Sequence, residues 1–255
     1  RFFSKLLIEK ELTQIFRKMS FYLISIFFFS IPPLYYFLYN DFFSFTKLIP
    51  ITEFFHFIPL MYLLILPVLS IVSWSKESLF LESLPFSTAQ IIFSKLISLT
   101  IILFILLFMS LFTPLYASVF MSFDWAQVCT AFIFLFMYGI FLLSLGQAIS
   151  ILFKHSISAL VSLSLIIIFT NQLIASPWAF KGIIDFFEIF SLLLSSFFFI
   201  LLAIFIKEKQ KEKKYLSKTI FLVVIAFILC FFNFKLFSIK IDFTKNKAFS
   251  ISEKT

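Results

Sequence analysis

The residues best placed to bind a partner lie in the polar stretch 74–95. It carries two carboxylates, Glu77 and Glu82, ahead of a Leu-Pro-Phe-Ser turn that ends in Ser87, and it finishes at Lys95. Ser87 or the threonine after it can cap a helix that runs into the next apolar segment, because a side-chain hydroxyl accepts a hydrogen bond from a free N–H group of the first helical turn. A short acidic helix followed by a turn predicts a docking surface for a partner protein. An ordinary interfacial loop is the alternative.

A second polar site lies inside an apolar segment, around Gln147. Gly146 and Ser150 are four residues apart, as are Ser144 and Ala148. Small residues at this spacing allow close contact between helices in lipid, and a glutamine can bridge them by hydrogen bonds. We interpret Gly146, Gln147 and Ser150 as helix-packing residues, with direct contact to a substrate as the alternative.

Catalytic chemistry has little support in this sequence. The predicted spans contain no Asp, Glu, Lys or Arg, and His56 lies at a span edge. A coupled carrier needs an ionisable group within the bilayer, and a membrane hydrolase needs a nucleophile with a base or a metal cluster. Cys129 and Cys230 lie in apolar runs and are interpreted as core residues, with no metal site.

The chain has three glycines and no phosphate-binding loop. We therefore expect no enzyme activity and no cofactor in this chain. If ATP powers the protein, ATP and Mg²⁺ would bind to another subunit.

Composition indicates that the solvent of this fold is lipid. Of the 255 residues 62% are apolar and 13% are charged, and the mean hydropathy is +1.08, whereas a soluble domain needs far more polar surface. Apolar runs of bilayer-spanning length recur along the chain. We predict an all-α fold, a polytopic transmembrane helical bundle, with kinks at prolines such as Pro114. The seven predicted spans are residues 19–39, 56–73, 96–119, 126–153, 157–176, 189–206 and 219–234.

Residues 1–18 are predicted to form an amphipathic helix that lies in the membrane interface. Charged residues, among them Glu9, Glu11 and Arg17, occupy the positions outside one apolar face. A helix directly before a span, with basic residues near anionic head groups, is typical of the interface. A cytosolic helix packed on a partner is the alternative. The predicted apolar face comprises Ile8, Leu12, Ile15, Phe16 and Met19.

The basic residues predict the orientation of the chain. With a cytosolic N-terminus, most Lys and Arg fall on the inner side, including the Lys- and Glu-rich linker 207–218, and the outer loops hold only Lys47 and Lys181. The lysines after the seventh span fall on the outer side and count against this scheme. Topology accounts for the net charge of +8, so we expect no nucleic-acid partner. The chain starts without Met and without a signal-peptide pattern, and we expect it to be part of a longer product.

The loop after the second span resembles that of the permease subunits of type 2 ABC exporters, in particular the gliding-motility-associated group. In that class the loop runs from an acidic segment to a Pro-x-Ser and on to a Gly-Lys ten residues past the proline, and Pro85, Ser87 and Lys95 fit this frame. A serine replaces the glycine, and the carboxylates are offset from the family's acidic positions. The layout agrees over residues 1–206. The resemblance implies a six-span domain at 19–206 that pairs with a second copy or a homologue and docks two ATPases through this loop.

The last stretch, 235–255, resembles the start of the auxiliary subunit found beside such permeases. There a membrane anchor leads through Asp-Leu-Thr and Ser-Leu-Ser motifs into an extracytoplasmic domain, and this chain has Asp-Phe-Thr from Asp242 and Ser-Ile-Ser from Ser250. The likeness implies a permease fused to an auxiliary anchor, whose membrane helix is the seventh span at 219–234. A tail without such a role is the alternative.

The sequence therefore predicts the permease subunit of an ATP-driven ABC exporter in the cytoplasmic membrane. Its expected partners are an ABC ATPase subunit, a second permease copy, a possible auxiliary domain and the lipid bilayer. A non-transporting membrane scaffold that anchors an extracytoplasmic domain for motility or envelope assembly is the alternative from a different class. The predicted ATPase-coupling residues are Glu77, Glu82, Pro85, Ser87 and Lys95.

Overall fold

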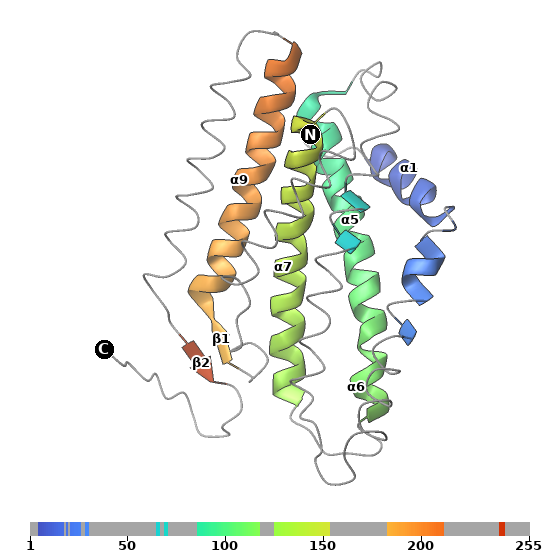
Figure 1. Ribbon diagram of the computed structural model, residues 1–255, viewed down its shortest axis with the longest axis vertical. Coiled ribbons are helices and arrows are strands. Elements are labelled where there is room, and N and C mark those ends of the chain that lie inside the picture. The colour runs from blue at the N-terminus through green and yellow to red at the C-terminus, as the bar shows by residue number, and fades with distance from the viewer. Residues whose placement is uncertain are drawn as a thin grey trace.

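The computed structural model contains a bundle of three long helices, with a shorter helix beside it and a pair of strands at one end (Figure 1). Most of the first and second predicted spans, the fifth and seventh spans, most of the linker and most of the tail lie outside the residues that the structure describes. The described residues are 5–17, 19, 21–26, 29–30, 65–66, 69–70, 86–117, 125–153, 183–211 and 240–242.

The three long helices are α5 (Thr88–Ser110), α7 (Trp125–Leu152) and α9 (Phe186–Lys211). Each is long and apolar enough to cross a membrane. They correspond to the third, fourth and sixth predicted spans, and α5 runs antiparallel to the other two (Figure 1). The prediction of a helical membrane protein is confirmed to this extent.

Charged residues mark the two ends of the apolar part of this bundle. In α9 no charged residue lies between Glu188 and Lys207, a stretch of about 27 Å of helix. In α5 and the short helix after it, none follows Lys95, and α7 has none at all. The charge-free length of α9 matches the hydrocarbon core of a bilayer, about 30 Å thick.

The third predicted span begins and ends differently in the structure. Its helix starts at Thr88, directly after the predicted cap at Ser87 and two turns before the predicted span, so that the buried Lys95 belongs to α5. The helix then ends at Ser110, and α6 (Phe112–Ala117) follows after a turn at Leu111. This break places Pro114 in the first turn of α6, where a missing N–H group costs no helical hydrogen bond.

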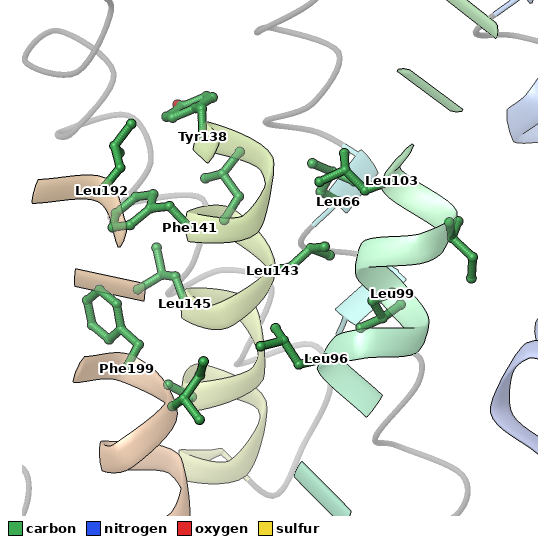
Figure 2. Close-up of a cluster of buried hydrophobic side chains, with 14 of the residues drawn as sticks. Leu66, Leu96, Leu99, Leu103, Tyr138, Phe141, Leu143, Leu145, Leu192 and Phe199 are labelled. Atoms are coloured by element: carbon green, nitrogen blue, oxygen red, sulfur yellow. The ribbon is translucent and has the colours of Figure 1, made fainter. Parts of the chain in front are cut away.

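The core lies between the three helices (Figure 2). Leu103 of α5 packs against α7 at Gly139, where a Cβ atom would lie 2.6 Å from Leu103 Cδ2. On the other side of α7, the rings of Phe141 and Phe199 meet edge to face with centroids 5.9 Å apart. Apolar contacts of this kind hold α5, α7 and α9 together as one packed unit.

The predicted amphipathic helix is α1 (Lys5–Phe16), and it packs on α5. Its most buried residues are Leu7, Glu11 and Ile15, spaced four residues apart. The predicted apolar face is therefore only partly correct: Ile15 belongs to the buried stripe, whereas Met19 is exposed. The stripe is rotated because a charged residue of α1 finds its partner on α5.

The one pair of strands among the described residues departs from the all-α prediction. Strand β1 (Ile183–Asp185) pairs in antiparallel fashion with β2 (Lys240–Asp242), with Ile184 opposite Ile241. The pair lies where α9 begins, whereas Lys211 lies at the far end of α9 (Figure 1). Lys211 and Lys240, which flank the seventh predicted span, are thus at opposite ends of the bundle, and the span itself stays a prediction.

Candidate functional site

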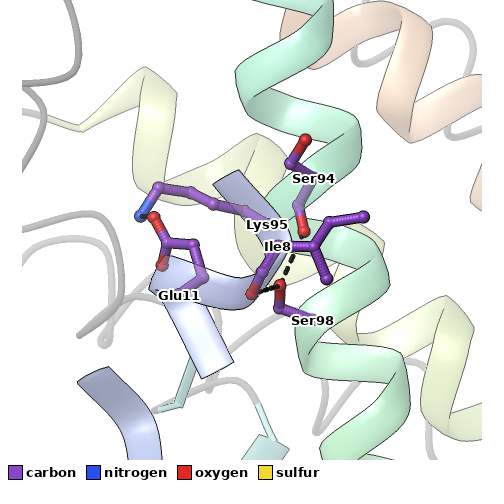
Figure 3. Close-up of polar contacts among 5 residues, drawn as sticks. All are labelled: Ile8, Glu11, Ser94, Lys95 and Ser98. Carbon is purple, nitrogen blue, oxygen red and sulfur yellow. Dashed lines mark hydrogen bonds and ion pairs between the residues drawn. The ribbon is translucent and has the colours of Figure 1, made fainter. Parts of the chain in front are cut away.

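Two opposite charges are buried together where α1 crosses α5. Lys95 Nζ lies 3.1 Å from Glu11 Oε1, and the two side chains are only 1% and 5% exposed (Figure 3). Charges are buried at this level only when they are paired, because the desolvation of an isolated ion is very costly. The pair therefore ties α1 to the first turns of α5.

A second polar contact lies one turn further along the same face of α5. The Ser98 hydroxyl is 2.9 Å from the Ser94 carbonyl oxygen of its own helix and 3.4 Å from the Ile8 carbonyl oxygen of α1 (Figure 3). Residues three apart on a helix share a face, so Lys95 and Ser98 both contact α1. We call Glu11, Lys95, Ser98 and the Ile8 carbonyl the α1–α5 clamp.

The Glu11–Lys95 pair is not a well-formed buried salt bridge. Within the described part of the chain, Glu11 Oε1 accepts no hydrogen bond, so its contact with Lys95 is one of charge alone. Such a pair adds little net stability over two packed apolar side chains, yet the loss of one member leaves a buried charge. We interpret the pair as specifying the position of α1 on α5.

The start of α5 is fixed by a capping box at Ser87. The Ser87 hydroxyl accepts a hydrogen bond from the Gln90 backbone N–H group at 3.2 Å, and the Gln90 side-chain oxygen accepts one from the Ser87 N–H group at 3.0 Å. Two otherwise free donors are satisfied in this way. The prediction that Ser87 or its neighbour caps this helix is confirmed.

Replacing Ser87 by Ala is expected to destabilise the first turn of α5 by about 1 kcal/mol, because the cap acceptor is lost. Hydrogen exchange of the backbone amides in this turn should become faster, while exchange in the middle of the helix stays unchanged. Ser87→Asp keeps an acceptor and is the matched control. Equal exchange in the Ser87→Ala protein and the wild type would contradict the stabilising role of the cap.

The other predicted coupling residues fall into two groups. Glu77, Glu82 and Pro85 lie outside the described residues, and their role stays a prediction. Lys95, which the resemblance assigns to the docking loop, is buried against α1 in this structure. Its side chain is therefore not part of the loop surface here.

Sequence reasoning missed Glu11. The residue was placed with the other charged positions of α1, and a Glu is almost never fully buried unless it is paired. The available signal was the stripe of Leu7, Glu11 and Ile15 at helical spacing. Its partner on α5 is distant in sequence and could not be read from that pattern.

The predicted helix-packing residues are deeply placed in α7. Gly146 and Gln147 are buried, and Ser150 is half-buried and donates its hydroxyl hydrogen to the Gln147 backbone oxygen at 2.8 Å. The close approach to α5 that the structure records is two turns earlier in α7, at Gly139. The packing role of Gly146, Gln147 and Ser150 stays a prediction.

In the described ranges no three His, Cys, Asp or Glu side chains lie close enough to hold a metal ion. Comparison with known proteins adds no identity: no family model matches the chain, and no curated protein matches its sequence.

Proposed function

We propose that this chain is the transmembrane permease subunit of an ATP-driven ABC exporter in the cytoplasmic membrane. The observation that carries the proposal is the α1–α5 clamp, which makes the capped start of α5 a stiff extension of the membrane bundle. The acidic loop with Glu77 and Glu82 leads directly into that start. A partner that pushes on the loop would therefore move α5 and α1 together.

The path from the loop into the bundle has three steps. Residues 88–94 of α5 precede the buried ion pair by about 10 Å of helix and connect the Ser87 cap to the clamp. Beyond the clamp, Leu103 packs on Gly139 of α7, and Phe141 of α7 packs on Phe199 of α9. Packed helices transmit displacement because a close-packed interior has little free volume.

The proposed orientation places the N-terminus and the start of α5 in the cytosol. The start of α5 and the end of α9, where Lys207 to Lys211 lie, are at the same end of the bundle (Figure 1). Positively charged residues near span ends favour the cytosolic side. The opposite end, with Asp185 and the β1–β2 pair, would face the exterior.

The proposed partners follow from what this chain would need. ATP hydrolysis, with ATP and Mg²⁺, would take place on an ABC ATPase subunit docked at the loop, and a second permease copy or homologue would complete the transport unit. An exposed apolar face of α9 is suited to contact with lipid acyl chains. That face includes Phe190, Leu194, Phe197 and Leu201.

The test is a charge reversal in the loop. Glu77→Lys/Glu82→Lys is expected to abolish the stimulation of ATP hydrolysis in the reconstituted complex, because like charges at a docking surface cost several kcal/mol. Glu208→Lys is the matched control, since Glu208 is exposed at the same end of the bundle. Both variants should reach the membrane in wild-type amounts. Unchanged stimulation in the double variant would remove the loop's proposed role.

The scaffold alternative is favoured by one specific observation, the pairing of β1 with β2. This pair attaches the segment after the seventh predicted span to the beginning of α9, which would hold the start of an extracytoplasmic domain close to the bundle. Copurification in mild detergent separates the two functions. A permease should bring a nucleotide-binding subunit in stoichiometric amount, and a scaffold should not.

A further inference from the structure

Gln147 is a buried amide without a hydrogen-bond partner. Its side chain is 1% exposed, and within the described part of the chain neither its Nε2 nor its Oε1 atom has a partner. Several buried hydroxyls in these helices donate to backbone carbonyls, as for Ser110, Ser144 and Ser196, whereas the Ser94 hydroxyl of α5, among the described residues, is unsatisfied like the Gln147 amide. An unsatisfied amide in an apolar bundle is costly, so its presence calls for an explanation.

Three hydroxyl groups donate to carbonyl oxygens of α7 near Gln147. The hydroxyl of Ser70 donates a hydrogen bond to the Leu143 carbonyl oxygen at 3.2 Å, and that carbonyl lies one turn before Gln147. Ser144 and Ser150, three residues to either side, also donate to carbonyl oxygens of α7. Two turns of α7 therefore bring together four polar groups. They are the hydroxyls of Ser70, Ser144 and Ser150 and the amide of Gln147.

The role of a polar bridge between helices does not account for this geometry. A glutamine that joins two helices does so by a hydrogen bond across their interface, and the Gln147 amide makes none in the described structure. A polar side chain that has no partner in one conformation is retained when a second conformation gives it one. Unsatisfied polar groups of this kind are found at functional sites.

We propose that Gln147 binds the exported cargo, through a neutral polar group of the cargo that both donates and accepts a hydrogen bond, such as a hydroxyl or an amide. The primary amide offers two N–H donors and one carbonyl acceptor, which fits such a group and offers no charge to an ion. This inference rests on the proposed permease function. It requires a second conformation of the bundle in which position 147 meets water and cargo.

Cysteine accessibility tests whether that conformation exists. Gln147→Cys and the control Leu145→Cys are made in a background with Cys129→Ala and Cys230→Ala, in the full chain in membrane vesicles. Leu145 is 2% exposed and faces α9 (Figure 2). A charged methanethiosulfonate reagent should modify Gln147→Cys about tenfold faster than the control, since a minor open state exposes only the polar position. Equal rates would overturn the proposal.

Thermal unfolding and transport provide the second measurement. Gln147→Leu should raise the Tm by about 3 °C, because an unsatisfied amide is removed, and should abolish cargo export while the ATPase subunit still copurifies. Gln147→Asn should restore part of the export. A lower Tm for Gln147→Leu would mean that the amide is satisfied in the resting state, and full export by this variant would mean that cargo does not need it; either result overturns the proposal.

Failure of the proposed function is distinguishable from failure of this inference. If no ATPase copurifies with the wild-type chain, the permease function fails. If the ATPase copurifies and position 147 is as unreactive as position 145, the binding role of Gln147 fails alone.

Discussion

Replacing Lys95 by Met is expected to destabilise the folded chain by about 3–5 kcal/mol, the largest effect of any single substitution considered for the clamp. The reason is that Glu11 would stay buried without its counter-charge, 3.1 Å from where the ammonium was. Glu11→Leu should have an effect of the same sign, because it removes the carboxylate that faces the buried Lys95 ammonium. Reversible unfolding of the purified chain in mixed micelles measures both changes.

The double variant Glu11→Leu/Lys95→Met is the decisive comparison. Two apolar side chains in place of a buried pair are expected to restore stability to the wild-type level or above it. Glu9→Gln is the matched control, because Glu9 forms an exposed i,i+4 pair with Lys5 and should matter little. Additive destabilisation in the double variant would contradict the pairing, since independent sites add and coupled sites do not.

The double variant of the clamp allows the effect on folding stability to be measured apart from the effect on ATPase stimulation. If the pair mainly specifies the position of α1, the double apolar variant should be stable and yet show weakened stimulation of ATP hydrolysis by the loop. The stability of this variant and its coupling are thus expected to move in different directions. A variant with normal stability and normal coupling would leave the clamp with a packing role only.

Much of the bundle could be predicted from local sequence because lipid imposes a simple rule. A helix that crosses the bilayer must be apolar for about twenty residues, and α5, α7 and α9 each meet that rule. The cap at Ser87 was equally local, since the cap and the Gln90 that completes it are three residues apart. Predictions of this kind depend only on neighbours along the chain.

The features that the sequence did not reveal are those that join distant segments. Glu11 is buried only because Lys95 lies across from it, and β1 forms only because residues 240–242 return to the beginning of α9. Lys95 was taken as the end of a polar loop, although it lies within the helix that the predicted cap begins. A charged side chain can be buried when an opposite charge lies beside it. Hydropathy depends only on neighbours along the chain, so it does not reveal such a partner.

Gly139 is the site of the second large expected effect. A Cβ atom there would lie 2.6 Å from Leu103 Cδ2, 2.8 Å from Leu103 Cδ1 and 3.2 Å from Leu103 Cγ. Leu103 is fully buried, so its side chain has little room to turn away. Gly139→Ala is therefore expected to destabilise the bundle by about 1–3 kcal/mol through overpacking, in spite of the higher helix propensity of Ala.

A double-mutant cycle with Leu103→Ala tests this contact directly. Leu103→Ala alone should cost about 2–5 kcal/mol, because it leaves a cavity in the core. In the double variant the methyl group of the new alanine enters that cavity, so the combined cost should be smaller than the sum of the two single costs. The two helices approach closely only because one carries no side chain at the contact. Additive costs would show that Leu103 does not occupy the space above Gly139, and the α5–α7 step of the proposed transmission path would then lose its structural basis.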